Sequence, residues 1–308
     1  MQGNVRGILC FLLMMPMCNA MAQTTGNEDV VVHRGVVYGE AVPLGKKKPK
    51  TLRCDIYQPS GDADTLRPLV VTLFGGGFVL GHRNYADMEL FCQRFAEHGY
   101  VAASIDYRLI ALRRASSANL LRAGYMGAQD LCMAIRYFKD NSRAYGIDTT
   151  RIYLLGQSAG AVIVLHALYL DELERPPETR TEPDPGPLLP EAVNSVAGAV
   201  ALWGSVFDPK IIDTSAHTPL CLIHGTVDRL VPYDSGYCFA SRHFPYVYGS
   251  KVVADRLNEL DMPNYEFHSF YGEKHALYFD WLCIWHLNPT KFETCFGIAL
   301  DFFNRWGR

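Results

Sequence analysis

The sequence carries no excess of charge of either sign. Its 308 residues include 29 lysines and arginines and 32 aspartates and glutamates, which leaves a formal net charge of −3 at pH 7. A basic patch is the electrostatic footprint of nucleic-acid or anionic-membrane binding, so this balance speaks against both. With 49% hydrophobic and 20% charged residues, the composition is that of a globular chain and excludes a disordered or fibrous protein.

The sequence also lacks an apolar run long enough to span a bilayer, which takes about 20 residues. The run at residues 8–17 is shorter, follows Arg6, and precedes an Ala-Met-Ala sequence that ends at Ala22. Small residues stand there at the two positions that a signal peptidase reads. The pattern predicts a signal peptide over residues 1–22 with cleavage after Ala22, and hence a secreted or periplasmic protein without a membrane span in the mature chain. A buried N-terminal helix is the alternative.

The sequence lacks cysteines that are spaced as in a zinc site. Of nine cysteines, Cys10 and Cys18 lie in the predicted leader, which leaves seven. An odd number leaves at least one thiol unpaired in a monomer. No Cys-x-x-Cys pair or Cys/His cluster has zinc-site spacing, so we predict no metal. Export permits disulfides, and Cys283 with Cys295 is the pair that we expect first.

Strand-like apolar runs alternate along the chain with helical periodicities. The predicted strands cover residues 30–42, 50–57, 69–74, 100–105, 152–155, 196–203, 220–224 and 265–270. The predicted helices cover residues 85–97, 120–141, 159–170, 250–260 and 290–306. Continuous apolar strands are typical of a parallel sheet that is buried on both faces. The alternation predicts an α/β domain over residues 23–308, with a single doubly wound, mostly parallel sheet flanked by helices.

A proline-rich stretch at residues 174–190 interrupts this alternation. Strands resume after it, so we interpret it as an inserted surface loop within one domain and not as a linker between two domains. It either forms a solvated loop or lines and covers a site; the sequence leaves both open.

The strongest chemical signal is the pentapeptide Gly-Gln-Ser-Ala-Gly, in which Ser158 is the central residue. A strand that turns sharply into a helix can expose one hydroxyl at the top of a sheet, and small residues are then needed two positions before and after the serine. Gly156 and Gly160 meet this need, between a predicted strand and a predicted apolar helix. Ser158 is therefore the candidate nucleophile.

A serine hydroxyl needs a base, and the base should be a histidine late in the chain. His275 follows the last predicted strand and is the candidate. His268 lies within that strand and His166 lies within the helix after Ser158, and both are expected to be structural. His286 lies in an apolar segment and is expected to be a histidine of the core.

The imidazole in turn needs a carboxylate to hold its tautomer. Asp228 follows a buried strand that ends at Gly225, which places it at the carboxyl edge of the sheet, where sites of open α/β folds lie. Asp234 and Glu273 are the competitors, expected to cap a turn and to be solvated.

The oxyanion that forms during acyl transfer needs fixed donors. The backbone N–H groups of Gly76 and Gly77, in the run Phe-Gly-Gly-Gly-Phe after a buried strand, and that of Ala159, after Ser158, are the candidates. One such donor is typically worth about 3 kcal/mol of barrier.

Together these residues resemble the α/β-hydrolase superfamily from about residue 51 onward. Within it, the sequence is similar to carboxylesterases of the hormone-sensitive-lipase and type-B kind, and to secreted bacterial feruloyl and acetyl-xylan esterases. The resemblance rests on residues 55–59, 74–78, 104–109, Asp130 with 141–148, the Ser158 elbow, 224–228 and 272–275. It departs at Phe74, where these families usually place a histidine that braces the glycine run. It also implies that Asp106 and Arg108 are structural and tie that loop down.

The resemblance implies a secreted serine carboxylic-ester hydrolase that forms an acyl-enzyme on Ser158 and needs no cofactor. Its substrate would be a small-molecule or polysaccharide-linked ester, with acetyl and feruloyl groups as hypotheses. A serine peptidase of the prolyl-oligopeptidase type and a non-catalytic binding protein on a hydrolase scaffold remain alternatives. Four aromatic residues could line a pocket or, as we expect, pack in the core: Phe78, Trp203, Tyr237 and Trp281.

Overall fold

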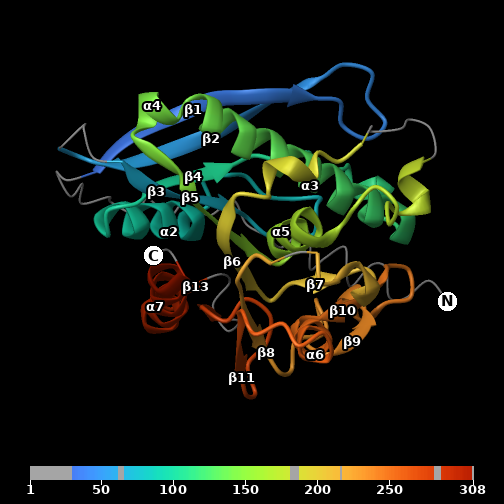
Figure 1. Cartoon of the computed structure of the whole chain (residues 1–308). Coiled ribbons are helices and arrows are strands. Elements are labelled where there is room, and N and C mark those ends of the chain that lie inside the picture. Colours follow the sequence, from blue (N-terminus) through green and yellow to red (C-terminus); the bar gives the residue numbers. More distant parts are fainter. Residues whose placement is uncertain (1–29, 62–65, 181–186, 216, 281–285, 307–308) are drawn as a thin grey trace.

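The computed structural model describes residues 30–61, 66–180, 187–215, 217–280 and 286–306 (Figure 1). The predicted signal peptide, Trp281 and Cys283 lie outside these ranges. Cys295 lies within them and carries a free, buried thiol, whereas the expected partner Cys283 lies outside the described residues.

A single eight-stranded sheet runs through the molecule. Its strands, in spatial order, are β1 (Val30–Ala41), β2 (Lys50–Pro59), β4 (Val101–Ile105), β3 (Arg67–Leu73), β5 (Ile147–Gln157), β6 (Val196–Leu202), β8 (Leu220–Gly225) and β11 (Tyr265–Phe270). The pairs β1–β2 and β2–β4 are antiparallel, and the other pairs are parallel. The predicted doubly wound, mostly parallel sheet is thus confirmed.

Helices cover both faces of this sheet (Figure 1). On one side α2 (Ala86–Glu97) contacts α7 (Pro289–Trp306) through the rings of Phe91 and Phe292, whose centroids are 4.5 Å apart. On the other side α3 (Ser117–Asp140) packs against α5 (Ala159–Tyr169). The short α4 (Ser142–Tyr145) leads into β5, and α6 (Ser250–Glu259) packs against β8 and β11.

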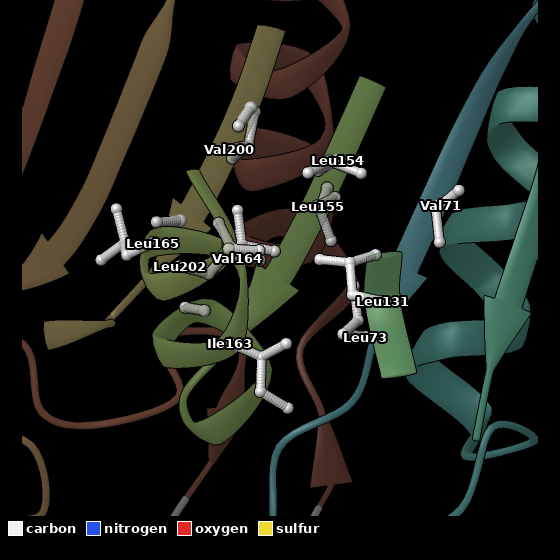
Figure 2. Close-up of a cluster of buried hydrophobic side chains, with 14 of the residues drawn as sticks. Val71, Leu73, Leu131, Leu154, Leu155, Ile163, Val164, Leu165, Val200 and Leu202 are labelled. Carbon is white, nitrogen blue, oxygen red and sulfur yellow. The ribbon is translucent and has the colours of Figure 1, made fainter. Parts of the chain in front are cut away.

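The apolar core lies between these layers. Figure 2 shows side chains of β3, β5 and β6 meeting those of α3 and α5, such as Val71, Leu154 and Ile163. Every residue of α5 is buried, because this helix lies between the sheet and α3. Because α5 is buried along its whole length, it cannot shift relative to β5, and the turn between the two elements is held in place.

A second, three-stranded sheet was not predicted. It consists of β7 (Ser205–Val206), β10 (Tyr246–Gly249) and β9 (Ser235–Tyr237). Its strands have two to four residues, too few for an alternating pattern to be visible in the sequence. A further pair, β12 (Phe279–Asp280) and β13 (His286–Leu287), is equally short.

The described part of the proline-rich insertion packs on α3. It contains two short 3₁₀ helices, η2 (Pro177–Arg180) and η3 (Pro190–Ala192), and residues 181–186 are not described. The guanidinium of Arg175 lies 5.0 Å from the ring centre of Tyr125 and donates to the Thr179 hydroxyl at 3.0 Å. Arg175 and Thr179 are buried, so this part is not a plain solvated loop. Among the described helices, none is both long and apolar enough to cross a membrane.

Candidate active site

The turn from β5 into α5 holds Ser158 in a strained backbone conformation. Its φ is 53° and its ψ is −118°, a combination that non-glycine residues rarely adopt. A Cβ atom on Gly156 would lie 2.3 Å from the Gly160 carbonyl oxygen, and one on Gly160 would lie 2.3 Å from the Leu73 carbonyl oxygen. Both glycines are therefore required by the close approach of neighbouring backbone, as their spacing predicts.

The structure brings the three predicted polar side chains into one chain of hydrogen bonds. The Ser158 hydroxyl donates to His275 Nε2 at 2.9 Å. His275 Nδ1–H donates to Asp228 Oδ2 at 2.6 Å. The three residues follow β5, β11 and β8, whose carboxyl ends share one edge of the sheet. This is the arrangement in which a carboxylate orients an imidazole and the imidazole can take a hydroxyl proton.

The Asp228 carboxylate is buried and is held on both oxygens. Oδ1 accepts the backbone N–H groups of Leu230 at 2.8 Å and Val231 at 3.1 Å. Oδ2 accepts from His275 and also from His224 Nε2 at 3.1 Å. Burial alone would raise the pKa of this carboxyl, but the charge of His275 and the hydrogen bonds from both histidines hold the pKa well below its usual range. The carboxylate is therefore ionised at any physiological pH.

The glycine run after β3 lies against the serine. A Cβ on Gly75 would lie 3.1 Å from the Cβ of Ser158. Gly76 and Gly77 have φ values of 121° and 60°, which glycine adopts without strain. Ala159 is the first residue of α5, so its N–H is among those that the helix leaves unpaired. The predicted donors thus lie in two segments that meet at Ser158.

Phe74, which replaces the expected histidine, is braced by Tyr107. The two rings stack with centroids 4.3 Å apart, and the Tyr107 hydroxyl donates to the Phe74 carbonyl oxygen at 2.9 Å. A polar brace is therefore present, but it acts on the backbone of Phe74 and comes from the segment after β4. The sequence did not reveal this role for Tyr107.

Asp106 and Arg108 have different partners. Asp106 Oδ2 accepts from Arg83 at 3.0 Å, and Arg83 follows the glycine loop. Arg108 instead donates to Asp130 of α3 at 2.8 Å and to the Met126 carbonyl oxygen at 2.9 Å. Asp106 therefore anchors the chain beyond the glycine loop, whereas Arg108 anchors the segment after β4 to α3.

A buried polar cluster behind the serine was missed by the sequence analysis. Gln157 donates to Asp87 Oδ2 at 2.7 Å, and the Tyr278 hydroxyl donates to Gln157 Oε1 at 2.6 Å. The Tyr278 ring packs edge-on against Trp203, which packs edge-on against His275. Burial raises the pKa of Asp87, and hydrogen bonds from Gln157, from Tyr278 and from nearby backbone N–H groups partly oppose this. The cluster joins α2, the serine turn and the loop of His275.

The competing histidines lie outside the relay. His166 is buried, bonded to the Val162 carbonyl oxygen at 2.7 Å, and its pKa is lowered to about 4 by burial, so it is neutral and structural as predicted. His268 Nε2 contacts Glu266 Oε2 at 3.3 Å within β11. His286 is exposed, so the prediction that it packs in the core is wrong.

The structure also shows where the competing carboxylates and the candidate aromatic residues lie. Asp234 is exposed, and the half-buried Glu273 pairs with Lys291 at 2.7 Å. Trp203 and Phe78 are buried, as expected of core residues. Tyr237 is 38% exposed on β9, so the prediction of core packing is wrong for it.

One group of possible metal ligands occurs among the residues described. Cys221, Glu266 and His268 lie on the β8–β11 pair with ligand atoms within 4.8 Å of one another. Glu266 already accepts from Arg305 at 2.6 and 2.7 Å and contacts His268. These contacts explain why Glu266 and His268 lie together, as parts of an ion-pair network, without a metal ion.

A mostly parallel sheet, a glycine-flanked serine turn at its carboxyl edge, and the order serine, aspartate, histidine are the features of the α/β-hydrolase fold, and the chain has this fold. Residues 54–183 match the BD-FAE family model. The solved structure of the Thermogutta terrifontis esterase Est2 with bound butyrate has a TM-score of 0.63 and 19% identity, covering 90% of this chain and 94% of that one.

Two curated relatives each match less than half of the chain. A probable isoprenylcysteine alpha-carbonyl methylesterase of Oryza sativa subsp. japonica is 36% identical over 134 residues, 43% of this chain and 26% of that protein. Gut esterase 1 of Caenorhabditis elegans is 27% identical over 148 residues, 48% of this chain and 24% of that protein. The chain therefore spans about a quarter of the length of these relatives.

Proposed function

We propose that the protein is a serine carboxylic-ester hydrolase of the carboxylesterase type. The observation that carries this proposal is the unbroken relay from Ser158 Oγ to His275 at 2.9 Å and from His275 to Asp228 at 2.6 Å. The similarity of part of the chain to proteins named as esterases supports an ester as the substrate.

The reaction follows from the geometry of the relay. Ser158 Oγ attacks the ester carbonyl carbon while its proton passes to His275 Nε2. The imidazolium that forms is stabilised by the Asp228 carboxylate, which keeps its own charge because its pKa is low. His275 then gives the proton to the departing alcohol, which leaves an acyl group on Ser158. A water molecule, deprotonated by His275, releases the acid by the same route.

The tetrahedral intermediate needs donors for its oxyanion, and we assign this role to the N–H groups of Gly76, Gly77 and Ala159. The close approach of Gly75 to Ser158 supports the assignment. Such donors act in a site where they need no reorganisation during the reaction, which is why they stabilise the transition state more than water does.

For the substrate we propose a small-molecule or polysaccharide-linked ester with a short acyl group such as acetyl, or an aromatic one such as feruloyl. Structures of the Thermogutta terrifontis esterase with butyrate and with propionate show that protein with short acids and support the first choice. The sequence resemblance to feruloyl and acetyl-xylan esterases supports both.

We further propose that the protein is exported, with residues 1–22 removed. The short apolar run, the preceding arginine and the Ala-Met-Ala sequence support this. Mass measurement of the protein recovered after expression with its native N-terminus tests it. A mature chain that begins at Gln23 is expected, and an intact N-terminus on the secreted or periplasmic protein would contradict it.

The function is tested with a panel of acetyl, butyryl, longer-chain and feruloyl esters, assayed with the wild type and with Ser158→Ala. Hydrolysis by the wild type at rates at least about 1,000-fold above those of Ser158→Ala is expected. Equal rates for the two proteins would favour a non-catalytic binding protein, and cleavage of a peptide but of no ester would favour a serine peptidase. Equal activity across the whole panel would remove the preference for acetyl or feruloyl groups.

A further inference from the structure

A second histidine, His224, contacts the carboxylate of the relay. It is the penultimate residue of β8 and is fully buried. Its Nε2 lies 3.1 Å from Asp228 Oδ2, the same oxygen that accepts from His275, and 3.1 Å from the Val231 carbonyl oxygen. The relay described above does not use this residue.

The neighbours of His224 define its tautomer. A carboxylate and a backbone carbonyl can only accept, so Nε2 must carry a proton. Nδ1 lies 2.8 Å from the Ser250 hydroxyl, which can donate to it. This tautomer, with Nε2–H donating and Nδ1 accepting, satisfies the hydrogen bonds at both ring nitrogens. Ser250 is fully buried at the start of α6, so this hydrogen bond is shielded from water.

The other groups around Asp228 add no competing charge. The buried face of α6 carries Ser250 and the apolar residues Val253, Ala254 and Leu257. The Cys238 thiol has its pKa raised to about 12 by burial and by the nearby Asp228, so it is neutral. The Tyr233 ring lies edge-on to His224, and the Tyr233 hydroxyl forms a hydrogen bond with the Ser269 hydroxyl at 2.7 Å. Among these neighbours, the side chains that donate to Asp228 are His224 and His275.

We propose that His224, with its tautomer held by Ser250, is a positioning residue that acts on His275 through Asp228. This inference rests on the proposed ester hydrolysis and names a further residue that tunes it. Two imidazole donors share Asp228 Oδ2, so the donor from His224 draws negative charge away from the oxygen that faces His275. The same contact helps to hold Oδ2 at the position where it accepts from His275 Nδ1.

The sign of the effect follows from this charge sharing. Without the His224 donor, Asp228 Oδ2 carries more negative charge and stabilises the protonated form of His275. The backbone donors of Leu230 and Val231 still hold Oδ1, so the carboxylate stays in place. His275 must be neutral to act as the base, so the acid limb of the activity profile moves to higher pH.

A matched pair of substitutions separates the donor from the volume of the side chain. In His224→Gln the amide nitrogen can occupy the position of Nε2 and donate to Asp228, whereas the shorter side chain of His224→Asn places its amide near Nδ1 and cannot. His166→Asn is the control, because His166 is also a buried histidine but contacts Val162 and Phe207 instead of the relay. Each protein is assayed with a short-chain ester from pH 5 to 9, and its thermal unfolding is measured.

For His224→Asn we expect the acid limb of kcat/KM to move up by about half to one pH unit, kcat at neutral pH to fall about tenfold, and KM to change less than about twofold. His224→Gln should restore the wild-type profile, and His166→Asn should lose thermal stability without moving the acid limb. An acid limb that is unmoved or lowered in His224→Asn would overturn the inference. Equal pH profiles for His224→Asn and His224→Gln would also overturn it. Should His224→Asn fail to fold, Ser250→Ala provides the test, with a smaller upward shift expected and an unmoved limb contradicting it.

A second measurement keeps this inference separable from the proposed function. The low-field proton resonance of His275 Nδ1–H, observed by NMR in the protein without substrate, reports the hydrogen bond to Asp228 directly. It should move in His224→Asn and stay in place in His166→Asn. If the resonance moves in His224→Asn but the wild type hydrolyses no ester, the proposed function is wrong and the inferred contact is supported. If the resonance stays in place but the wild type is an active esterase, the inference is wrong and the proposed function is supported.

Discussion

The two ends of the relay are held in place by different physical means. At the serine end, backbone crowding fixes the geometry: Gly156 and Gly160 leave no room for a Cβ, and Ser158 takes a positive φ. At the aspartate end, hydrogen bonds fix the geometry, with four donors directed at one buried carboxylate. The comparison teaches that the first end is sensitive to added volume and the second to lost donors or charge.

The largest effect is expected at the aspartate end. In Asp228→Asn the amide keeps the size of the side chain but cannot stabilise the imidazolium of His275 and can impose the wrong tautomer on it. We expect kcat to fall about 10⁴-fold, the loss known for this change in serine-protease relays. Ester hydrolysis measured beside thermal unfolding checks this, and a loss below about tenfold in a folded protein would contradict the relay.

The serine end should respond to a single methyl group. In Gly160→Ala the new Cβ would lie 2.3 Å from the Leu73 carbonyl oxygen, and in a buried turn the backbone must shift to accept it. We expect a loss of about 2–4 kcal/mol in the free energy of unfolding, together with most of the activity. Gly297→Ala is the matched control in denaturant unfolding, because the added Cβ would meet nothing within 4 Å beyond the nearby backbone of its own helix, α7. Equal stability of the two variants would show that the turn is not crowded.

Acid should lower the free energy of unfolding of the wild type more than that of Asp228→Asn. The pKa of Asp228 is lowered on folding, so the carboxylate adds stability above the pKa of the unfolded chain, near 4, and this stability is lost as the pH falls toward the folded value. Between about pH 4 and pH 2 the wild type should lose up to about 1.4 kcal/mol per pH unit more than Asp228→Asn. Parallel stability curves for the two proteins would contradict the lowered pKa.

The smallest effect concerns the glycine loop, which lies between the two ends. Tyr107→Phe keeps the ring that stacks on Phe74 but removes the hydroxyl that donates to its carbonyl oxygen. A buried carbonyl without this partner should cost about 1 kcal/mol of stability, and a looser loop should lower kcat a few-fold with little change in KM. Unchanged kcat and unfolding would show that the loop needs no polar brace.

The serine end could be predicted from the sequence because its determinants are local. The glycines at positions 156 and 160, the apolar strand before them and the apolar helix after them all lie within one segment. The sheet strands with long apolar runs were predictable for the same reason. Their positions also placed Asp228 and His275 at the correct edge of the sheet.

The other contacts of the site and the second sheet could not be predicted, because they depend on contacts between distant segments. His224 and Ser250 are 26 positions apart and meet only because α6 packs against β8. Tyr107 and Phe74 are 33 positions apart, and the hydroxyl of Tyr107 finds a backbone atom that no side-chain pattern marks. The strands β9 and β10 are too short to show a period, so the second sheet, which carries the exposed Tyr237, was missed.

The central claim, that Ser158 is an activated nucleophile, is tested most directly by covalent labelling. The wild type is treated with an organophosphate that reacts with activated serines, and the modified peptide is identified by mass spectrometry. We predict a single adduct on Ser158, which is absent in Ser158→Ala and strongly slowed in Asp228→Asn. Labelling at another residue, or no labelling of a folded wild-type protein, would contradict the account.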